Sequence, residues 1–123
     1  MTKEKKTILI VEDDPDVLDY ISTFLKDNGY NAVTAEDGQI GLQEARRIKP
    51  DIVLLDLMMP KQSGTDFYRK LHKDKELSNI PIIVVSGAAG KHLAVPKPAA
   101  ILDKPVDKDE LLGAISRVLS PNT

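Results

Sequence analysis

The chain has 123 residues, enough for one domain with one core, and its hydrophobic and charged fractions of 41% and 29% are ordinary for a globular protein. A net charge of −2, the absence of Trp and an aromatic fraction of 4% argue against direct nucleic-acid binding through a basic field or base stacking. The absence of Cys excludes disulfides, thiol catalysis and Cys-ligated zinc and suits a cytoplasmic protein, and no segment reaches the ~20 apolar residues of a membrane helix.

The first half of the chain predicts two strands, each followed by an amphipathic helix. The opening strand is an apolar, β-branched run, and Asp14 followed by Pro15 is typical of the start of a helix. Apolar side chains at helical spacing continue from there to Asn28-Gly29, a common helix end. The elements expected in order are a strand at Thr7–Val11, a helix up to Asn28, a strand at Asn31–Ala35, a turn at Asp37-Gly38 and a helix ended by Pro50.

The second half is organised around the aliphatic run Ile52–Leu55, which indicates a strand buried on both faces and leads directly into Asp56. Gly and Pro leave room for at most about two helical turns between residues 88 and 98, so a shortened or absent fourth helix is expected there. Asp107 and Glu110 form a capping-box pair before a final amphipathic helix. The remaining elements expected are a helix at about Thr65–Lys73, a strand at Ile80–Val85 and a strand at Ala99–Leu102.

The alternation of buried strands with amphipathic helices predicts an α/β fold, in which a parallel sheet carries helices on both faces. One such domain accounts for residues 1–123, with a short basic tail at residues 1–6 and a C-terminal tail at residues 120–123. The start at Met1 favours a stand-alone protein, and an excised domain of a longer protein is the alternative.

Polar side chains stand at the carboxyl ends of several predicted strands. Glu12 and Asp13 follow the first strand, Asp56 ends the third, Ser86 follows the fourth and Lys104 follows the fifth. Because the carboxyl ends of parallel strands share one edge of the sheet, we expect these groups to meet near its switch point.

Neighbouring carboxylates repel one another unless a cation joins them, and oxygen ligands without Cys or clustered His suit Mg²⁺ or Mn²⁺. Such a cation readily shares phosphate oxygens, to which Ser86 can donate a hydrogen bond and Lys104 can bring a positive charge. The pattern therefore predicts a site that places a phosphoryl group on Asp56, with the carboxylate as nucleophile.

These motifs resemble the receiver domain of two-component response regulators, and the resemblance covers about Thr7 to Leu119. The matching stretches are ILIVEDDP with its acidic pair, DIVLLDLMMPKQSG with its phosphoacceptor position, IIVVSG with its strand-end hydroxyl, and LDKP with its lysine. The resemblance implies a flavodoxin-like, doubly wound sheet of five parallel strands in the order 2-1-3-4-5. It also implies a role in a two-component phosphorelay.

The resemblance implies a role for each matching residue. Asp56 would accept a phosphoryl group from a sensor histidine kinase or a phosphotransfer protein, with Mg²⁺ as cofactor. The domain would catalyse only its own phosphorylation and dephosphorylation, and it would signal by contact with a downstream protein target, as a monomer or weak dimer. The implied contacts are Asp13 and Asp56 directly on the metal, Met58 through its backbone carbonyl, Glu12 through water, and Ser86 and Lys104 on the phosphoryl oxygens.

The chain departs from the family pattern in three places. The segment between Ser86 and Lys104 is shorter than usual by about one helical turn, so the usual output and dimer face is expected to be altered. Ile101 stands where the family commonly has Tyr or Phe, so the ring movement that reports phosphorylation is expected to be missing or different. Met58 and Ala88 are apolar where polar side chains help to position the hydrolytic water, so slow self-dephosphorylation is expected.

Simpler interpretations also stand beside these roles. Asp14 is expected only to cap the first helix, and Asp51, His72 and His92 are expected to be surface residues. A receiver-like scaffold that binds a partner without being phosphorylated is the main alternative function. An Asp-nucleophile phosphatase would need a second Asp where Met58 stands, and the chain has no GxxxxGK[ST] phosphate-binding loop.

Overall fold

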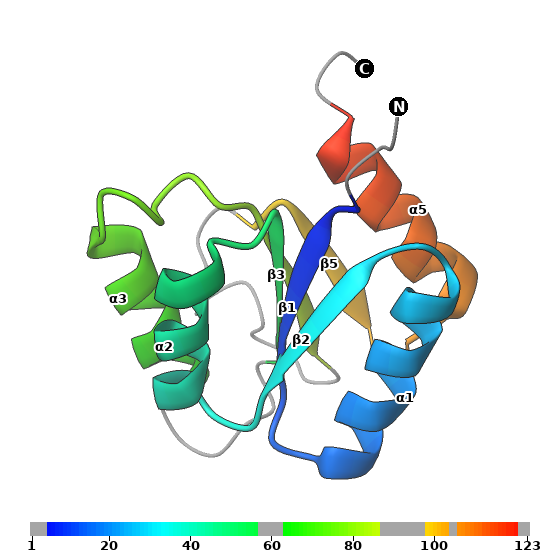
Figure 1. Ribbon diagram of the computed structural model, residues 1–123, viewed down its shortest axis with the longest axis horizontal. Coiled ribbons are helices and arrows are strands. Elements are labelled where there is room, and N and C mark those ends of the chain that lie inside the picture. Colours follow the sequence, from blue (N-terminus) through cyan, green and yellow to red (C-terminus); the bar gives the residue numbers. More distant parts are fainter. Residues whose placement is uncertain (1–4, 57–62, 87–97, 104–105, 121–123) are drawn as a thin grey trace.

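The computed structural model describes residues 5–56, 63–86, 98–103 and 106–120, which form an α/β domain (Figure 1). Strands and helices alternate along most of the chain, as the apolar periodicity predicts. The elements are, in chain order, β1 (Thr7–Val11), α1 (Pro15–Asp27), β2 (Asn31–Ala35), α2 (Gly38–Ile48), β3 (Ile52–Asp56), α3 (Ser63–Lys73), β4 (Ile82–Ser86), β5 (Ala100–Asp103) and α5 (Lys108–Leu119).

The strands form one parallel sheet in the order β2-β1-β3-β4-β5, so the expected fold class and strand order are confirmed. β1 lies at the switch point, because it pairs with β2 on one side and with β3 on the other. Leu9 of β1, for example, lies between Val33 of β2 and Val53 of β3. The parallel register gathers the carboxyl ends of the strands at one edge, where β1 continues toward α1 and β2 toward α2 (Figure 1).

Helices cover both faces of the sheet (Figure 1): α1 and α5 pack on one face, which we call the α1–α5 side, and α2 and α3 pack on the other. Side chains alternate between the faces along each strand, so Ile10 of β1 joins the core on the α1–α5 side while Leu9 joins the core beneath α2 and α3. β3 is buried along its whole length. Burial on both faces explains why its sequence shows no alternation of apolar and polar residues.

The ends of α1 follow the signals in its sequence. The Asp14 side chain accepts hydrogen bonds from the backbone N–H groups of Asp16 (2.9 Å) and Val17 (3.5 Å), and Pro15 occupies the first helical position. After the helix, Gly29 adopts a φ of +93°, a conformation that other residues rarely adopt. The expected capping role of Asp14 is confirmed, and the cap fixes the short connection between β1 and α1.

The predicted start of β4 was wrong by two residues, because the strand begins at Ile82 and not at Ile80. Pro81 has no N–H to donate to the strand ladder, although its carbonyl accepts a hydrogen bond from the N–H of Val53 (3.0 Å). The proline therefore precedes the strand that it was expected to open. The other corrections are that α3 begins at Ser63 instead of about Thr65 and that β5 covers Ala100–Asp103 instead of Ala99–Leu102.

Asp51 lies at the opposite edge of the sheet from Asp56, as expected, and it has a structural role that the sequence did not predict. It is half-buried, and its Oδ2 atom accepts a hydrogen bond from the N–H of Thr7 (2.8 Å). Its own N–H donates to the carbonyl of Thr7 (2.8 Å). Asp51 thus ties the start of β1 to the start of β3, a structural role at the edge away from Asp56.

Residues 87–97 lie outside the described residues, and so does His92 among them. The expected shortening or loss of a fourth helix therefore stays a prediction. Within the part of the chain that the structure describes, no helix combines the length and the hydropathy needed to cross a membrane.

Candidate functional site

Two carboxylates stand side by side at the carboxyl edge of the central strands. β1 and β3 pair at Val11 and Leu55, so the residues that follow them, Glu12 and Asp56, lie at the same level of this edge. Both are buried, with only 3% of their surface exposed. The N–H of Glu12 donates to the carbonyl of Ala35 (3.0 Å), which extends the pairing of β1 with β2 and fixes the Glu12 backbone.

Asp13 completes an acidic cluster with these two residues. One carboxylate oxygen from each of Glu12, Asp13 and Asp56 lies within 4.8 Å of the other two. Asp13 is exposed, so the cluster is open to solvent on its side. At this separation two unit negative charges repel by roughly 3 kcal/mol at an effective dielectric constant of about 20, so the cluster favours a cation.

A hydrogen bond from the helix cap holds the Glu12 side chain. Its Oε2 atom accepts from the backbone N–H of Asp14 (3.2 Å). The side chain of Asp14 caps α1 at the same time, so one residue anchors both the helix and the carboxylate of Glu12. This orienting contact was not predicted from the sequence, where Asp14 had only the capping role.

The donor atoms fit a hard divalent cation. Mg²⁺ prefers oxygen ligands at about 2.1 Å, so any two of its ligands are about 3 to 4 Å apart, a little less than the 4.8 Å within which the three carboxylate oxygens lie. The exposed side at Asp13 leaves room for the water molecules that Mg²⁺ retains. Glu12, expected to act through water, and Asp13 and Asp56, expected as direct ligands, are therefore brought together, whereas Met58 lies outside the described residues.

Ser86 ends the strand next to the acidic cluster. Asp56 pairs with the residue that precedes Ser86, and Ser86 itself pairs with Asp103, the last residue of β5. The backbone of Ser86 therefore lies at the same edge as Asp56, one residue further along. Lys104 follows Asp103 in the sequence and lies outside the described residues, as Met58 does, so their expected roles stay predictions.

A cavity of about 20 Å³ adjoins Asp56 on the α1–α5 side of the sheet. Glu12 and Asp56 line it together with apolar side chains from separate elements. From the sequence, Val17 and Ile21 were expected on the inner face of a helix, whereas Val106 had no assigned role. No local signal in the sequence indicates that these residues meet beside Asp56. The apolar lining includes Ile10 of β1, Leu54 of β3, Val85 of β4, Val17 and Ile21 of α1, and Val106.

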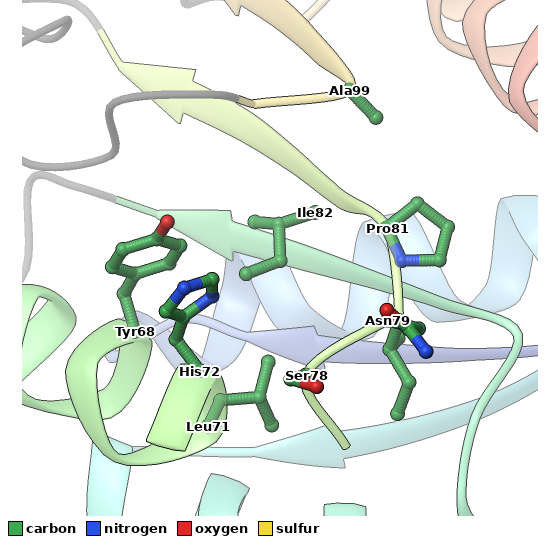
Figure 2. A pocket seen from close by; sticks show the side chains of 9 residues that line it. Tyr68, Leu71, His72, Ser78, Asn79, Pro81, Ile82 and Ala99 are labelled. Atoms are coloured by element: carbon green, nitrogen blue, oxygen red, sulfur yellow. The ribbon is translucent and has the colours of Figure 1, made fainter. Parts of the chain in front are cut away.

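A larger pocket, of about 630 Å³, lies at the opposite edge of the sheet, where β4 begins (Figure 2). Tyr68 and His72 of α3 line it with their rings stacked, the ring centroids 5.6 Å apart, and Pro81 and Ile82 line it from the start of β4. His72 is exposed, as expected. The described lining of this pocket includes no carboxylate, so the pocket is separate from the acidic cluster.

Comparison with known proteins gives consistent matches over nearly the whole chain. A family model described as the response regulator receiver domain matches residues 8–116. Protein PilH of Pseudomonas aeruginosa is 38% identical over 120 residues, which cover 92% of this chain and 97% of PilH. Protein Rrf1 of Nitratidesulfovibrio vulgaris is 34% identical over 113 residues, which cover 92% of this chain and 82% of Rrf1.

Longer proteins and solved structures match as well. The transcriptional regulatory protein GlrR of Escherichia coli is 33% identical over 121 residues, but the match covers only 27% of GlrR. The solved structure of a CheY-like response regulator receiver domain protein from Methanospirillum hungatei has a TM-score of 0.86 and 29% identity over 94% of both chains. The chemotaxis protein CheY4 of Vibrio cholerae has a TM-score of 0.85 and 26% identity, covering 94% of this chain and 100% of that one.

Proposed function

The chain belongs to the response regulator receiver domain family, and we propose that it is a phospho-accepting receiver in which Asp56 takes a phosphoryl group from a histidine kinase or a phosphotransfer protein. Receiver domains act in two-component signalling and bind Mg²⁺ through acidic residues. The observation that carries the proposal is the meeting of Glu12, Asp13 and Asp56, whose oxygens lie within 4.8 Å of one another.

In the proposed transfer, a carboxylate oxygen of Asp56 forms a bond to the phosphorus of a phosphohistidine. The bond between the phosphorus and the imidazole nitrogen breaks, and its electron pair stays on the imidazole. Asp56 is suited to this attack because it ends a fully buried strand, which sets the position of its carboxylate. Mg²⁺, when bound, supplies positive charge that offsets both the carboxylates and the phosphoryl oxygens.

The remaining roles that we propose follow from the family and from the geometry of the edge. Glu12 is held by the N–H of Asp14 and backs the ion through a water molecule. Ser86 ends β4 at this edge, Lys104 follows β5 in the sequence, and a hydroxyl and an ammonium group suit phosphoryl oxygens. The proposed metal ligands are Asp13, Asp56 and the backbone carbonyl of Met58, and the proposed phosphoryl contacts are Ser86 and Lys104.

Receiver domains are signalling domains and do not turn over an external substrate. We propose that this one catalyses only its own phosphorylation and dephosphorylation, as a single domain over residues 1–123 in the cytoplasm. Its output is contact with a downstream protein, as a monomer or weak dimer. The net charge of −2 supports a protein target in preference to nucleic acid or an anionic membrane surface.

The test is phosphorylation by a small donor. Incubation with acetyl phosphate and Mg²⁺ is expected to add the mass of one phosphoryl group, as seen by intact-mass spectrometry. The Asp56→Asn variant is expected to take up none, because its amide is a poor nucleophile. Chelation of the metal is expected to slow the reaction of the unmodified protein strongly, since the carboxylates then repel the incoming phosphate.

Asp51→Asn serves as the matched control. Asp51 is an acidic residue beside the same strand but at the opposite edge, and the amide oxygen of Asn can still accept the hydrogen bond from Thr7. This variant is expected to be phosphorylated normally. Uptake that persists in Asp56→Asn, or no uptake by the unmodified protein, would contradict the proposal and favour a scaffold that binds its partner without phosphorylation.

A further inference from the structure

The cavity on the α1–α5 side brings apolar side chains against the proposed phosphoacceptor. Val17 and Ile21 reach it from α1, and Val106 reaches it from the segment that precedes α5. Ile21 is buried, and Val17 and Val106 are half-buried. These three side chains, which we call the apolar wall, form the apolar part of the cavity lining that comes from outside the sheet.

The size and the lining of the cavity limit the water that it can hold. A volume of about 20 Å³ has room for no more than one water molecule. An ordered buried water needs two to four polar partners, and Glu12 and Asp56 are the polar side chains among the described lining. The cavity therefore admits at most one water molecule beside the carboxylate of Asp56, and the apolar wall offers that water no hydrogen bond.

We propose that the apolar wall of Val17, Ile21 and Val106 prolongs the life of the aspartyl-phosphate by keeping water from the carboxylate of Asp56. The inference rests on the proposed function, because it concerns the phosphorylated form of Asp56. It adds a determinant of phosphoryl lifetime that lies inside the described fold. This determinant is distinct from the apolar residues Met58 and Ala88, which concern the attacking water.

The physical reason lies in the leaving group of the hydrolysis. The oxygen of a water molecule bonds to the phosphorus, and the bond between the phosphorus and the Asp56 oxygen breaks, with its electron pair returning to the carboxylate. The water's proton passes to phosphate or solvent, and the products are inorganic phosphate and the free carboxylate. Hydration stabilises the charge that develops on the departing carboxylate, and the wall withholds that hydration.

The same wall acts on the formation of the aspartyl-phosphate. A carboxylate that is poorly hydrated loses less hydration when it bonds to phosphorus, so its attack is easier. A more polar wall should therefore slow phosphorylation and accelerate dephosphorylation together. Loss of packing alone gives no reason for phosphorylation to slow while dephosphorylation accelerates. Observing both changes would therefore distinguish the proposal from a purely structural role of the wall.

Val106→Thr is the decisive variant, because Thr has nearly the shape of Val but carries a hydroxyl that can donate a hydrogen bond. We expect its phosphoryl group to be lost about two- to tenfold faster, the factor that one added hydrogen bond supplies. Phosphorylation by acetyl phosphate should be slower as well. Val17→Thr tests the same wall from α1. The phosphorylated fraction is followed by intact-mass spectrometry with saturating Mg²⁺ after the donor is removed.

Two further variants serve as controls. Val106→Ile adds a methyl group to the wall and is expected to keep or lengthen the phosphoryl lifetime. Val118→Ala removes apolar volume from the same core on the α1–α5 side, away from the cavity lining, and is expected to leave both rates unchanged. Thermal unfolding establishes that each variant is folded at the assay temperature.

The outcomes separate this inference from the proposed function. If Val106→Thr and Val17→Thr take up phosphate and lose it at the unmodified rates, the inference is overturned and the proposed function stands. If Val118→Ala decays as fast as Val106→Thr, general loosening of the core explains the effect and the inference is also overturned. If the unmodified protein takes up no phosphoryl group, the proposed function fails and the inference fails with it.

Discussion

At the scale of single residues, the site depends on two carboxylates that are almost inaccessible to solvent. Glu12 and Asp56 are each 3% exposed. Burial of charged groups is costly unless hydrogen bonds or an opposite charge meet them. The N–H of Asp14 meets Glu12, and a cation shared with Asp13 would offset the repulsion within the cluster. Cation binding would therefore offset part of the free energy that it costs to bury these carboxylates.

Lys49 shows a different residue-scale effect at the end of α2. It adopts a φ of +48°, the left-handed conformation, and its N–H donates to the carbonyl of Ala45 (2.8 Å). A side chain in this conformation costs about 1 kcal/mol relative to Gly. The ion pair of Lys49 with Glu76 (3.2 Å) is exposed on both sides and contributes little in return.

We therefore expect Lys49→Gly to raise the free energy of unfolding by about 0.5–1 kcal/mol, because relief of the left-handed strain exceeds the added chain entropy. Urea denaturation measures the change. Gly29→Ala is the reverse control, since Gly29 has a φ of +93° with open space around it. That variant should lose about 1 kcal/mol. A loss of stability in Lys49→Gly would show that the Glu76 contact outweighs the strain.

At the scale of elements, α2 packs tightly against its neighbours at Gly41. A Cβ atom there would lie 3.0 Å from Cγ2 of Val11 and 3.1 Å from Cε1 of Phe67. Both neighbours are buried core side chains, so neither has free space to move into. Gly41 therefore lets α2 pack closely against both β1 and α3.

Gly41→Ala is expected to lower the free energy of unfolding by about 1–3 kcal/mol, because the added methyl group overpacks this contact. Gly113→Ala is the matched control in α5, where a Cβ atom would meet nothing within 4 Å. It should raise the free energy of unfolding by about 0.5–1 kcal/mol through helix propensity. Urea denaturation measures the free energy of unfolding of both variants. The same change in both would contradict the explanation by overpacking at Gly41.

α1 and α5 are joined by a contact that also concerns the site. The Nζ atom of Lys108 lies 5.3 Å from the ring centroid of Tyr20 and 5.5 Å from that of Phe24. A cation over two aromatic rings attracts both of them. The contact helps to hold α1, which carries Val17, beside the segment with Val106, and so it supports both sides of the cavity at Asp56.

At the scale of the whole molecule, cation binding and folding are coupled. The three carboxylates of the cluster come from the ends of β1 and β3 and meet only when the sheet is formed. A cation held by Asp13 and Asp56, with Glu12 beside them, therefore binds the folded protein in preference to the unfolded chain. Ligands with this preference raise stability by mass action.

We expect Mg²⁺ at ten times its Kd to add about 1.4 kcal/mol, a rise in Tm of about 5 °C for a domain of this size. Thermal unfolding with and without Mg²⁺ measures it. Asp13→Asn should lose the rise, and without Mg²⁺ it should be at least as stable as the unmodified protein, because one repulsive charge is gone. An equal rise in Asp13→Asn would place the stabilising ion elsewhere.

The sequence by itself determined the order of the elements and the residues of the candidate site. Aliphatic runs such as Ile52–Leu55 and the cap at Asp14 are local signals, since they act through burial and hydrogen bonding within a few residues. Parallel strands share one carboxyl edge, so the polar residues at the strand ends were expected to converge. Glu12, Asp13 and Asp56 do converge there.

Only the tertiary structure decided the features that depend on partners distant in the chain. β4 begins at Ile82 because its pairing with β3 starts at that residue. Asp51 has a structural role because its side chain accepts a hydrogen bond from the N–H of Thr7. The apolar wall at Asp56 joins residues of α1 to Val106, which is far from them in the sequence. Periodicity shows which side chains are buried, but only packing shows which of them meet.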